Sequence, residues 1–340
     1  MKKFAVILLA LVMALGLCSV GWATGEEAAE VDGTKYDTVQ AAIDAANGKT
    51  VTLLKSVETE MVTVQAGHTV VLNTNGMTLT NKSGSYAINN NGTLTINGGG
   101  KIVRENAGNS AIRTIGTLTL ENVTVEVKPD TMIAVKVDEN GVGTKGTLFV
   151  KGGTVLNAAN GQAIQAWGDV TVSGGTINGE VAAWSVKDWN PGNIAIEGGV
   201  VNGDVTANQR VKDGNYPDKA ASVTIKGGTV TGQVAVAYVE FKNGELSDRS
   251  DDKDNFTVDG NISVSGGTFT TADVKQYLAS GKQQNADGTV TDKSYYYVPG
   301  TTVDAAAASP KTFDTGVALY VGMALTSAAG AVFVGKKRED

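Results

Sequence analysis

The sequence predicts an all-β protein folded as a parallel β-helix, a solenoid of about nine coils. A short motif recurs along the chain, beginning at Thr93, Thr117, Thr147, Asp169, Asn193, Ser222 and Asn261, with weaker copies at Thr50 and Thr69. Apolar residues alternate within the copies, as in Leu94/Ile96 and Ile194/Ile196, which is the period of a strand. Most copies then carry a Gly-Gly pair, which permits a bend, and a second short strand follows.

A third apolar element recurs later in most repeats. Its copies are Ala87-Ile88, Ala111-Ile112, Ala134-Val135, Ala163-Ile164, Ala183-Trp184 and Ala235-Val236. Three short strands in one repeat cannot bury their apolar faces alone, but stacked repeats enclose a continuous core. We therefore expect the β-helix domain to cover residues 31–300, with Trp184 inside the Ile/Val ladder.

Short helices are expected to cap the open ends of this solenoid, because unpaired edges invite aggregation. Residues 37–47 predict the first cap: Asp37 is a candidate N-cap with Gln40 three residues later, and Asn47-Gly48 ends the helix. The segment from Thr270 to Gly281 predicts a second short helix, with Val274 and Leu278 on one face.

The N-terminus has the pattern of a secretory signal peptide, residues 1–23. Lys2 and Lys3 precede an apolar run, and small residues at Gly21 and Ala23 suit cleavage after Ala23. The alternative is lipoprotein processing at Cys18, which Leu17 disfavours because a small residue is preferred there.

The C-terminus has the pattern of a membrane anchor. After a linker at residues 301–314, residues 315–335 contain no charge and would span about 30 Å as a helix, enough for a bilayer core. The basic residues of the 336–340 tail favour the cytoplasmic side. We therefore expect an exported protein displayed outside the cell.

Composition excludes several classes of function. The chain has 28 Lys and Arg against 35 Asp and Glu, which argues against binding nucleic acid. Cys18 is the only cysteine and falls in the predicted signal peptide, so the mature chain has no disulfide. His68 is the only histidine, which we expect in a solvated turn, and its isolation argues against a zinc site or a Ser-His-Asp triad.

Taken together, the repeats resemble the right-handed parallel β-helix of pectate-lyase-like proteins. The opening from Val31 to Val57 and the phrase VVLNTNGMTL resemble surface β-helix proteins of Gram-positive bacteria. Ser309, Pro310, Lys311, Thr312 and Phe313 resemble the LPxTG or SPKTG sorting motif, although Phe313 replaces the glycine. The resemblance implies attachment to the cell wall by a sortase, or to the membrane if Phe313 blocks cleavage.

Paired carboxylates are the candidate for catalysis. TINGEV and VVNGDV place Glu180 and Asp204 24 residues apart, on neighbouring coils about 4.8 Å apart, with Gln233 next. Such a pair suits a retaining glycosidase or a calcium site, and otherwise is a polar turn copied by duplication. The acidic run from Ser247 to Asn255 is a second calcium candidate, or a solvated loop. No other cofactor is expected.

Long insertions provide the candidate binding face. Residues 138–146, 187–192, 209–220 and 243–255 each precede the first strand of a coil, so we expect them along one corner with Trp167 and Trp189. The predicted function is a surface binding, adhesion or scaffold module for a glycan or a surface protein. The alternative is a polysaccharide lyase or glycoside hydrolase of the β-helix type.

Overall fold

The computed structural model describes residues 27–106, 109–128, 132–139, 143–242, 245–256 and 258–294. One compact unit runs from Met1 to Lys293, and a second comprises Ser294–Asp340, of which only Ser294 is described. The predicted signal peptide, sorting motif and membrane anchor therefore lie outside the described residues. Within the described ranges, no helix is both long and apolar enough to cross a bilayer.

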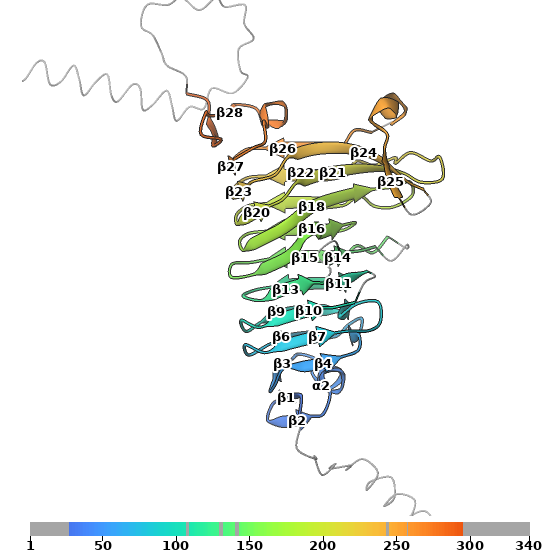
Figure 1. Ribbon diagram of the computed structural model, residues 1–340, viewed down its shortest axis with the longest axis vertical. Coiled ribbons are helices and arrows are strands. Elements are labelled where there is room, and N and C mark those ends of the chain that lie inside the picture. The colour runs from blue at the N-terminus through green and yellow to red at the C-terminus, as the bar shows by residue number, and fades with distance from the viewer. Residues whose placement is uncertain are drawn as a thin grey trace, which may run out of the picture. The chain divides into compact units, whose positions relative to one another are not determined.

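The first sheet stacks one strand from each coil (Figure 1). In spatial order its strands are β2 (Thr34–Tyr36), β1 (Ala29–Val31), β3 (Lys49–Leu53), β6 (Thr69–Asn73), β9 (Thr93–Asn97), β12 (Thr117–Leu120), β15 (Thr147–Val150), β17 (Asp169–Val172), β19 (Asn193–Ile196), β22 (Ser222–Ile225) and β26 (Asn261–Val264). All neighbours from β3 to β26 pair in parallel.

The register of this sheet confirms the sequence repeat. Thr93 pairs with Thr69 and with Thr117, Thr147 pairs with Asp169, and Ser222 pairs with Asn261. From Thr69 onward each repeat therefore begins at the same place in its coil, and the unequal spacing is taken up elsewhere. The predicted start at Thr50 is two residues out of register, because Thr50 pairs with Val71. The chain has the parallel, solenoid-like β fold that the repeat predicts.

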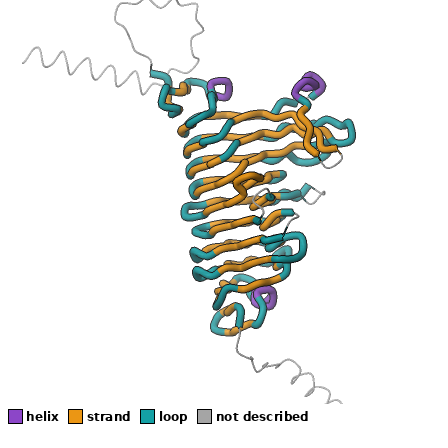
Figure 2. Tube along the Cα trace, viewed as in Figure 1, coloured by secondary structure: helices purple, strands orange, loops and turns teal. Residues whose placement is uncertain are grey.

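The second sheet provides the other sides of the coils (Figure 2). One arm contains β4 (Val57–Thr59), β7 (Thr78–Asn81), β10 (Lys101–Arg104) and β13 (Thr124–Val127), and another contains β5 (Val62–Val64), β8 (Ile88–Asn90), β11 (Ser110–Thr114) and β14 (Ile133–Val137). Both arms join β16 (Val155–Ala166), which pairs onward to β18 (Thr176–Ser185). Beyond β18 lie β20 (Val200–Asn202), β21 (Val205–Val211), β23 (Thr229–Val230), β24 (Val234–Lys242), β25 (Glu245–Asp248) and β27 (Thr268–Phe269).

The bend between the sheets needs a residue whose backbone adopts the left-handed conformation, with positive φ. In the pair Gly174-Gly175, the second glycine has φ 90°, a conformation that glycine adopts without steric cost. The repeat that has Asn122-Val123 at these two positions places its left-handed residue one position earlier, at Asn122 with φ 49°, and asparagine is among the residues that tolerate this conformation best. The Gly-Gly pairs therefore act as the predicted bends.

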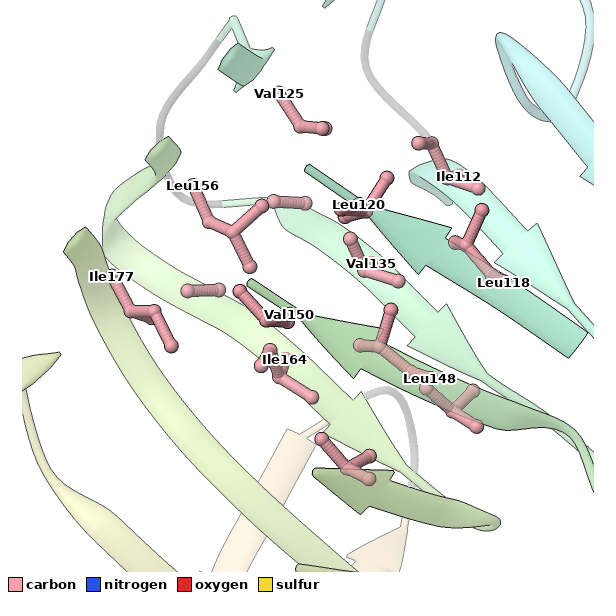
Figure 3. Close-up of a cluster of buried hydrophobic side chains, with 14 of the residues drawn as sticks. Ile112, Leu118, Leu120, Val125, Val135, Leu148, Val150, Leu156, Ile164 and Ile177 are labelled. Atoms are coloured by element: carbon pink, nitrogen blue, oxygen red, sulfur yellow. The ribbon is translucent and has the colours of Figure 1, made fainter. Parts of the chain in front are cut away.

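The core is a continuous apolar column inside the coils (Figure 3). Leu118 and Leu120 of β12, and Leu148 and Val150 of β15, are fully buried, while Thr119 between the first two is only partly buried. The alternation predicted from the sequence therefore places one face of each strand inward. Full burial of such a side chain contributes roughly 1.5–3 kcal/mol of transfer free energy.

The N-terminal cap begins one residue later than predicted. The helix α2 spans Val39–Ala45, and its N-cap is Thr38 rather than Asp37, because the Thr38 side chain accepts a hydrogen bond from the Ala41 N–H at 3.2 Å. Gln40 does not complete a capping box. Its side-chain amide instead accepts from the Thr63 N–H at 2.7 Å and donates to the Thr63 carbonyl at 2.9 Å, which ties the helix to β5.

The predicted second helix at Thr270–Gly281 is wrong. Only Lys275–Tyr277 forms a single 3₁₀ turn, and a hairpin of β28 (Lys282–Gln284) and β29 (Val290–Asp292) follows. The Gln284 side chain accepts from the Val274 N–H and donates to the Ala272 carbonyl. These bonds satisfy the main-chain groups without a helix. The other 3₁₀ segment, Ser250–Asn255, lies in the predicted acidic run.

The predicted third ladder is correct only in the first coils. Ile88 pairs with Ile112, and Val135 pairs with Ile164. After Ile164 the ladder continues through Val181, Val205 and Val234. The prediction that Trp184 and Val236 occupy these positions of the ladder is therefore wrong. A register shift between Gln162 and Ile164 places Gln162 opposite Glu180 and Ile164 opposite Val181, so the ladder continues at Val181.

Candidate ligand-binding site

A cavity of about 1050 Å³ lies against the second sheet. Its lining comes from β14, β16, β18 and β21, and from the loop that carries Trp189. The side chains that matter for the argument are Gln162, Gln165, Trp167, Glu180, Trp184, Trp189, Asp204 and Arg210. Both predicted pairs of site residues, Glu180 with Asp204 and Trp167 with Trp189, are therefore brought to one cavity.

Strand alternation explains why large aromatic side chains face outward here. Val181 and Ala183 of β18 belong to the main core, whereas Ala182 and Trp184 form a separate apolar cluster with Trp167. Residues of opposite parity on a strand point to opposite faces of the sheet. Trp184 thus lies on the outer face of the sheet, in contrast to the predicted place in the inner ladder.

The three tryptophans form one contiguous aromatic group. Trp167 stacks on Trp184 with ring centroids 5.5 Å apart and planes at 27°, and Trp189 meets Trp167 edge-on at 5.3 Å. Arg210 lies over the Trp167 ring at 6.0 Å. Trp167 and Trp184 are only 5% and 4% exposed, so they pack as a small core, while Trp189 is half-buried.

Three of the four predicted insertions, at 138–146, 187–192 and 209–220, gather at one side of the solenoid. The Asn190 N–H donates to Glu139 Oε2 at 2.8 Å, and Lys219 Nζ donates to Asn190 Oδ1 at 3.1 Å. The insertions at 138–146 and 209–220 therefore hold the insertion at 187–192, which presents Trp189. Trp189 is fixed by its loop contacts as well as by the other rings.

A chain of side-chain hydrogen bonds runs beside the aromatic group and converges on Glu180. From one side, Gln165 Nε2 donates to Gln162 Oε1, and Gln162 Nε2 donates to Glu180 Oε2, each at 2.8 Å. From the other side, Thr206 Oγ1 donates to Glu180 Oε1 at 2.6 Å. These bonds orient several planar polar groups at the cavity before any ligand arrives.

The cavity also contains positive charge. Arg210 is partly buried, and this burial lowers the pKa of its guanidinium below the ordinary value while nearby Asp213 opposes the change. A guanidinium remains protonated under such shifts, so Arg210 stays a cation and a fork of donors. Lys212 follows on the same side of the strand and also lines the cavity.

The carboxylates of Glu180 and Asp204 act as hydrogen-bond acceptors. Both oxygens of Glu180 already accept hydrogen bonds, and Asp204 Oδ1 accepts the Gln233 N–H at 2.7 Å. A general acid for glycoside cleavage must instead present a proton to the glycosidic oxygen. This arrangement suits recognition of hydroxyl groups better than acid catalysis.

We therefore expect no lyase or hydrolase activity on polysaccharides in the wild-type protein. The Glu180→Gln and Asp204→Asn variants should be equally inactive. Reducing-end and unsaturated-product assays on pectin, xylan and β-glucans measure this. Turnover in the wild type that both substitutions abolish would establish the enzymatic alternative.

The other sequence candidates lie away from this cavity. His68 is half-buried rather than solvated, and its Nδ1 atom has no hydrogen-bond partner. In the acidic run, Asp248 accepts hydrogen bonds from the Ser250 N–H and hydroxyl. Within the ranges that the structure covers, no three His, Cys, Asp or Glu side chains are arranged to hold a metal ion.

Trp184, Gln162, Gln165 and Arg210 are the site residues that sequence reasoning missed. A signal was present: the phrases NGEV, NGDV and TGQV align Val181, Val205 and Val234, which assigns Trp184 to the outer face by parity. No family model, no curated protein and no solved structure matches this chain.

Proposed function

We propose that this protein is a binding module that recognises glycans at the tryptophan-lined cavity. The observation that carries the proposal is the placement of the half-buried Trp189, supported from behind by the buried Trp167 and Trp184, beside a preformed network of planar polar side chains. Indole rings stack on the apolar faces of sugars. Amide, carboxylate and guanidinium groups provide the paired donors and acceptors that hydroxyl groups need.

A glycan fits this site better than a protein partner does. Protein interfaces have an apolar centre with a polar rim. Here the aromatic group is flanked directly by amides and charges, and Glu180, Gln162 and Gln165 are fixed by their own hydrogen bonds. Such preorganised polar groups reduce the entropy cost of binding a hydroxyl-rich ligand.

The test is a screen of the purified protein on a glycan array and, in parallel, on an array of host and bacterial surface proteins. We expect saturable binding to a set of related glycans. Binding confined to proteins would replace the glycan proposal with a protein receptor. An absence of binding on both arrays would leave the scaffold role as the better account.

We further propose that the fold is the right-handed β-helix of about nine coils and that the module is displayed on a Gram-positive cell. The fold proposal rests on the sequence repeat and the parallel strand pairing, and the proposal of surface display rests on the sequence patterns of residues 1–23 and 309–340. Deleting residues 315–340 is expected to release the protein into the medium. Recovery of the intact chain from the cytosol would contradict export, and extraction by detergent alone would favour a membrane anchor over sortase attachment.

A further inference from the structure

A second cavity, of about 640 Å³, adjoins the first along the same strands. Asn178 lines the second cavity, whereas Gly179 and Glu180, the next residues of β18, line the first. The same division occurs between Asn202 and Asp204, and Ala159 lines both cavities. The two cavities are therefore consecutive parts of one cleft that follows the strand direction.

The floor of the second cavity is a column of asparagines. Asn157, Asn178 and Asn202 occupy paired positions on consecutive coils. Asn178 Nδ2 donates to Asn157 Oδ1 at 2.7 Å, and Asn202 Nδ2 donates to Asn178 Oδ1 at 2.9 Å. Each primary amide has two N–H donors and two acceptor positions, so the bonds within the column use only part of this capacity.

The spacing of the two parts defines the size of a ligand. From Asn178 to Trp184 is six residues along β18, at most about 20 Å at the rise of a strand, since the chain changes direction at Gly179, which has φ 131°. A single sugar on the tryptophans does not reach the asparagines, whereas a linear oligosaccharide lying along the strands contacts both. The column offers amide donors and acceptors side by side, which complement the N–H and C=O of acetamido groups.

Building on the proposed function, we propose that Asn157, Asn178 and Asn202 form a second subsite, which binds acetamido groups of a linear N-acetylated oligosaccharide whose other end lies on the tryptophans. A purely structural role for the column, tying coils together, is the competing explanation. The two differ in their effect on ligand length, because a structural role alone does not make affinity depend on the number of sugars.

The experiment is calorimetric titration of the full chain with chitobiose, chitohexaose and cellohexaose, which lacks acetamido groups. We expect chitohexaose to bind at least about tenfold more tightly than chitobiose, since a second subsite adds hydrogen bonds. Asn178→Ala should remove this gain and leave chitobiose affinity unchanged. Thr224→Ala, an outward position on β22 in the other sheet, is the matched control and should keep the gain.

Thermal unfolding of each variant accompanies the titrations, and Asn202→Ala, at the exposed end of the column, replaces Asn178→Ala if the latter does not fold. An equal affinity for the dimer and the hexamer, an equal gain with cellohexaose, or a gain that survives both substitutions would overturn the subsite. Binding of other glycans on the array but of no chito-oligosaccharide would overturn the subsite alone. A blank glycan array would overturn the proposed function as well.

Discussion

Trp167→Ala is expected to lower the free energy of unfolding by about 3–5 kcal/mol, the range for removing a buried tryptophan. The ring is 5% exposed, stacks on Trp184 at 5.5 Å and meets Trp189 at 5.3 Å, so its removal leaves a cavity bounded by two other rings. Chemical denaturation followed by circular dichroism measures the change.

The control for Trp167 is Phe149→Ala. Phe149 is the outward residue of β15 and is 38% exposed, so its loss is expected to change stability by no more than about 0.5 kcal/mol. If Trp167→Ala were as mild as Phe149→Ala, the aromatic group would not be a packed cluster. The outer face would then be loose rather than a preformed site.

Trp189→Ala is expected to weaken glycan binding about thirtyfold, the equivalent of roughly 2 kcal/mol for a hot-spot residue. Trp189 is half-buried and belongs to a loop, so this substitution should affect stability much less than Trp167→Ala does. Calorimetric titration with a glycan that is positive on the array measures the affinity.

Trp189→Phe is the matched variant for this position. It retains an aromatic face for stacking and loses only the indole N–H and part of the ring area, so most of the affinity should remain. Equal affinities for wild type, Trp189→Ala and Trp189→Phe would place the ligand away from this ring.

The coil repeat was predictable because strand alternation and the turn at each repeat are local properties. The pairing of Thr69, Thr93 and Thr117 follows directly from equal positions in the repeated motif. The caps were less predictable. Gln40 bonds to Thr63 and Gln284 bonds to Val274, and these tertiary partners decide where each cap begins and whether it is helical.

The site was only partly predictable for a similar reason. Glu180, Asp204, Trp167 and Trp189 were identified from equivalent places in successive repeats, and all four line one cavity. Because Ile164 pairs with Val181, the inner ladder continues at Val181, and parity along β18 places Trp184 on the outer face instead.

Intrinsic tryptophan fluorescence during a glycan titration tests the central claim most directly. The chain has four tryptophans, of which Trp167, Trp184 and Trp189 line the cavity, and Trp22 falls in the predicted signal peptide. With Trp22→Phe in place, emission therefore reports on the cavity alone. The account predicts a saturable change in emission whose midpoint matches the calorimetric Kd. Calorimetric binding with no change in emission would show that the glycan binds elsewhere.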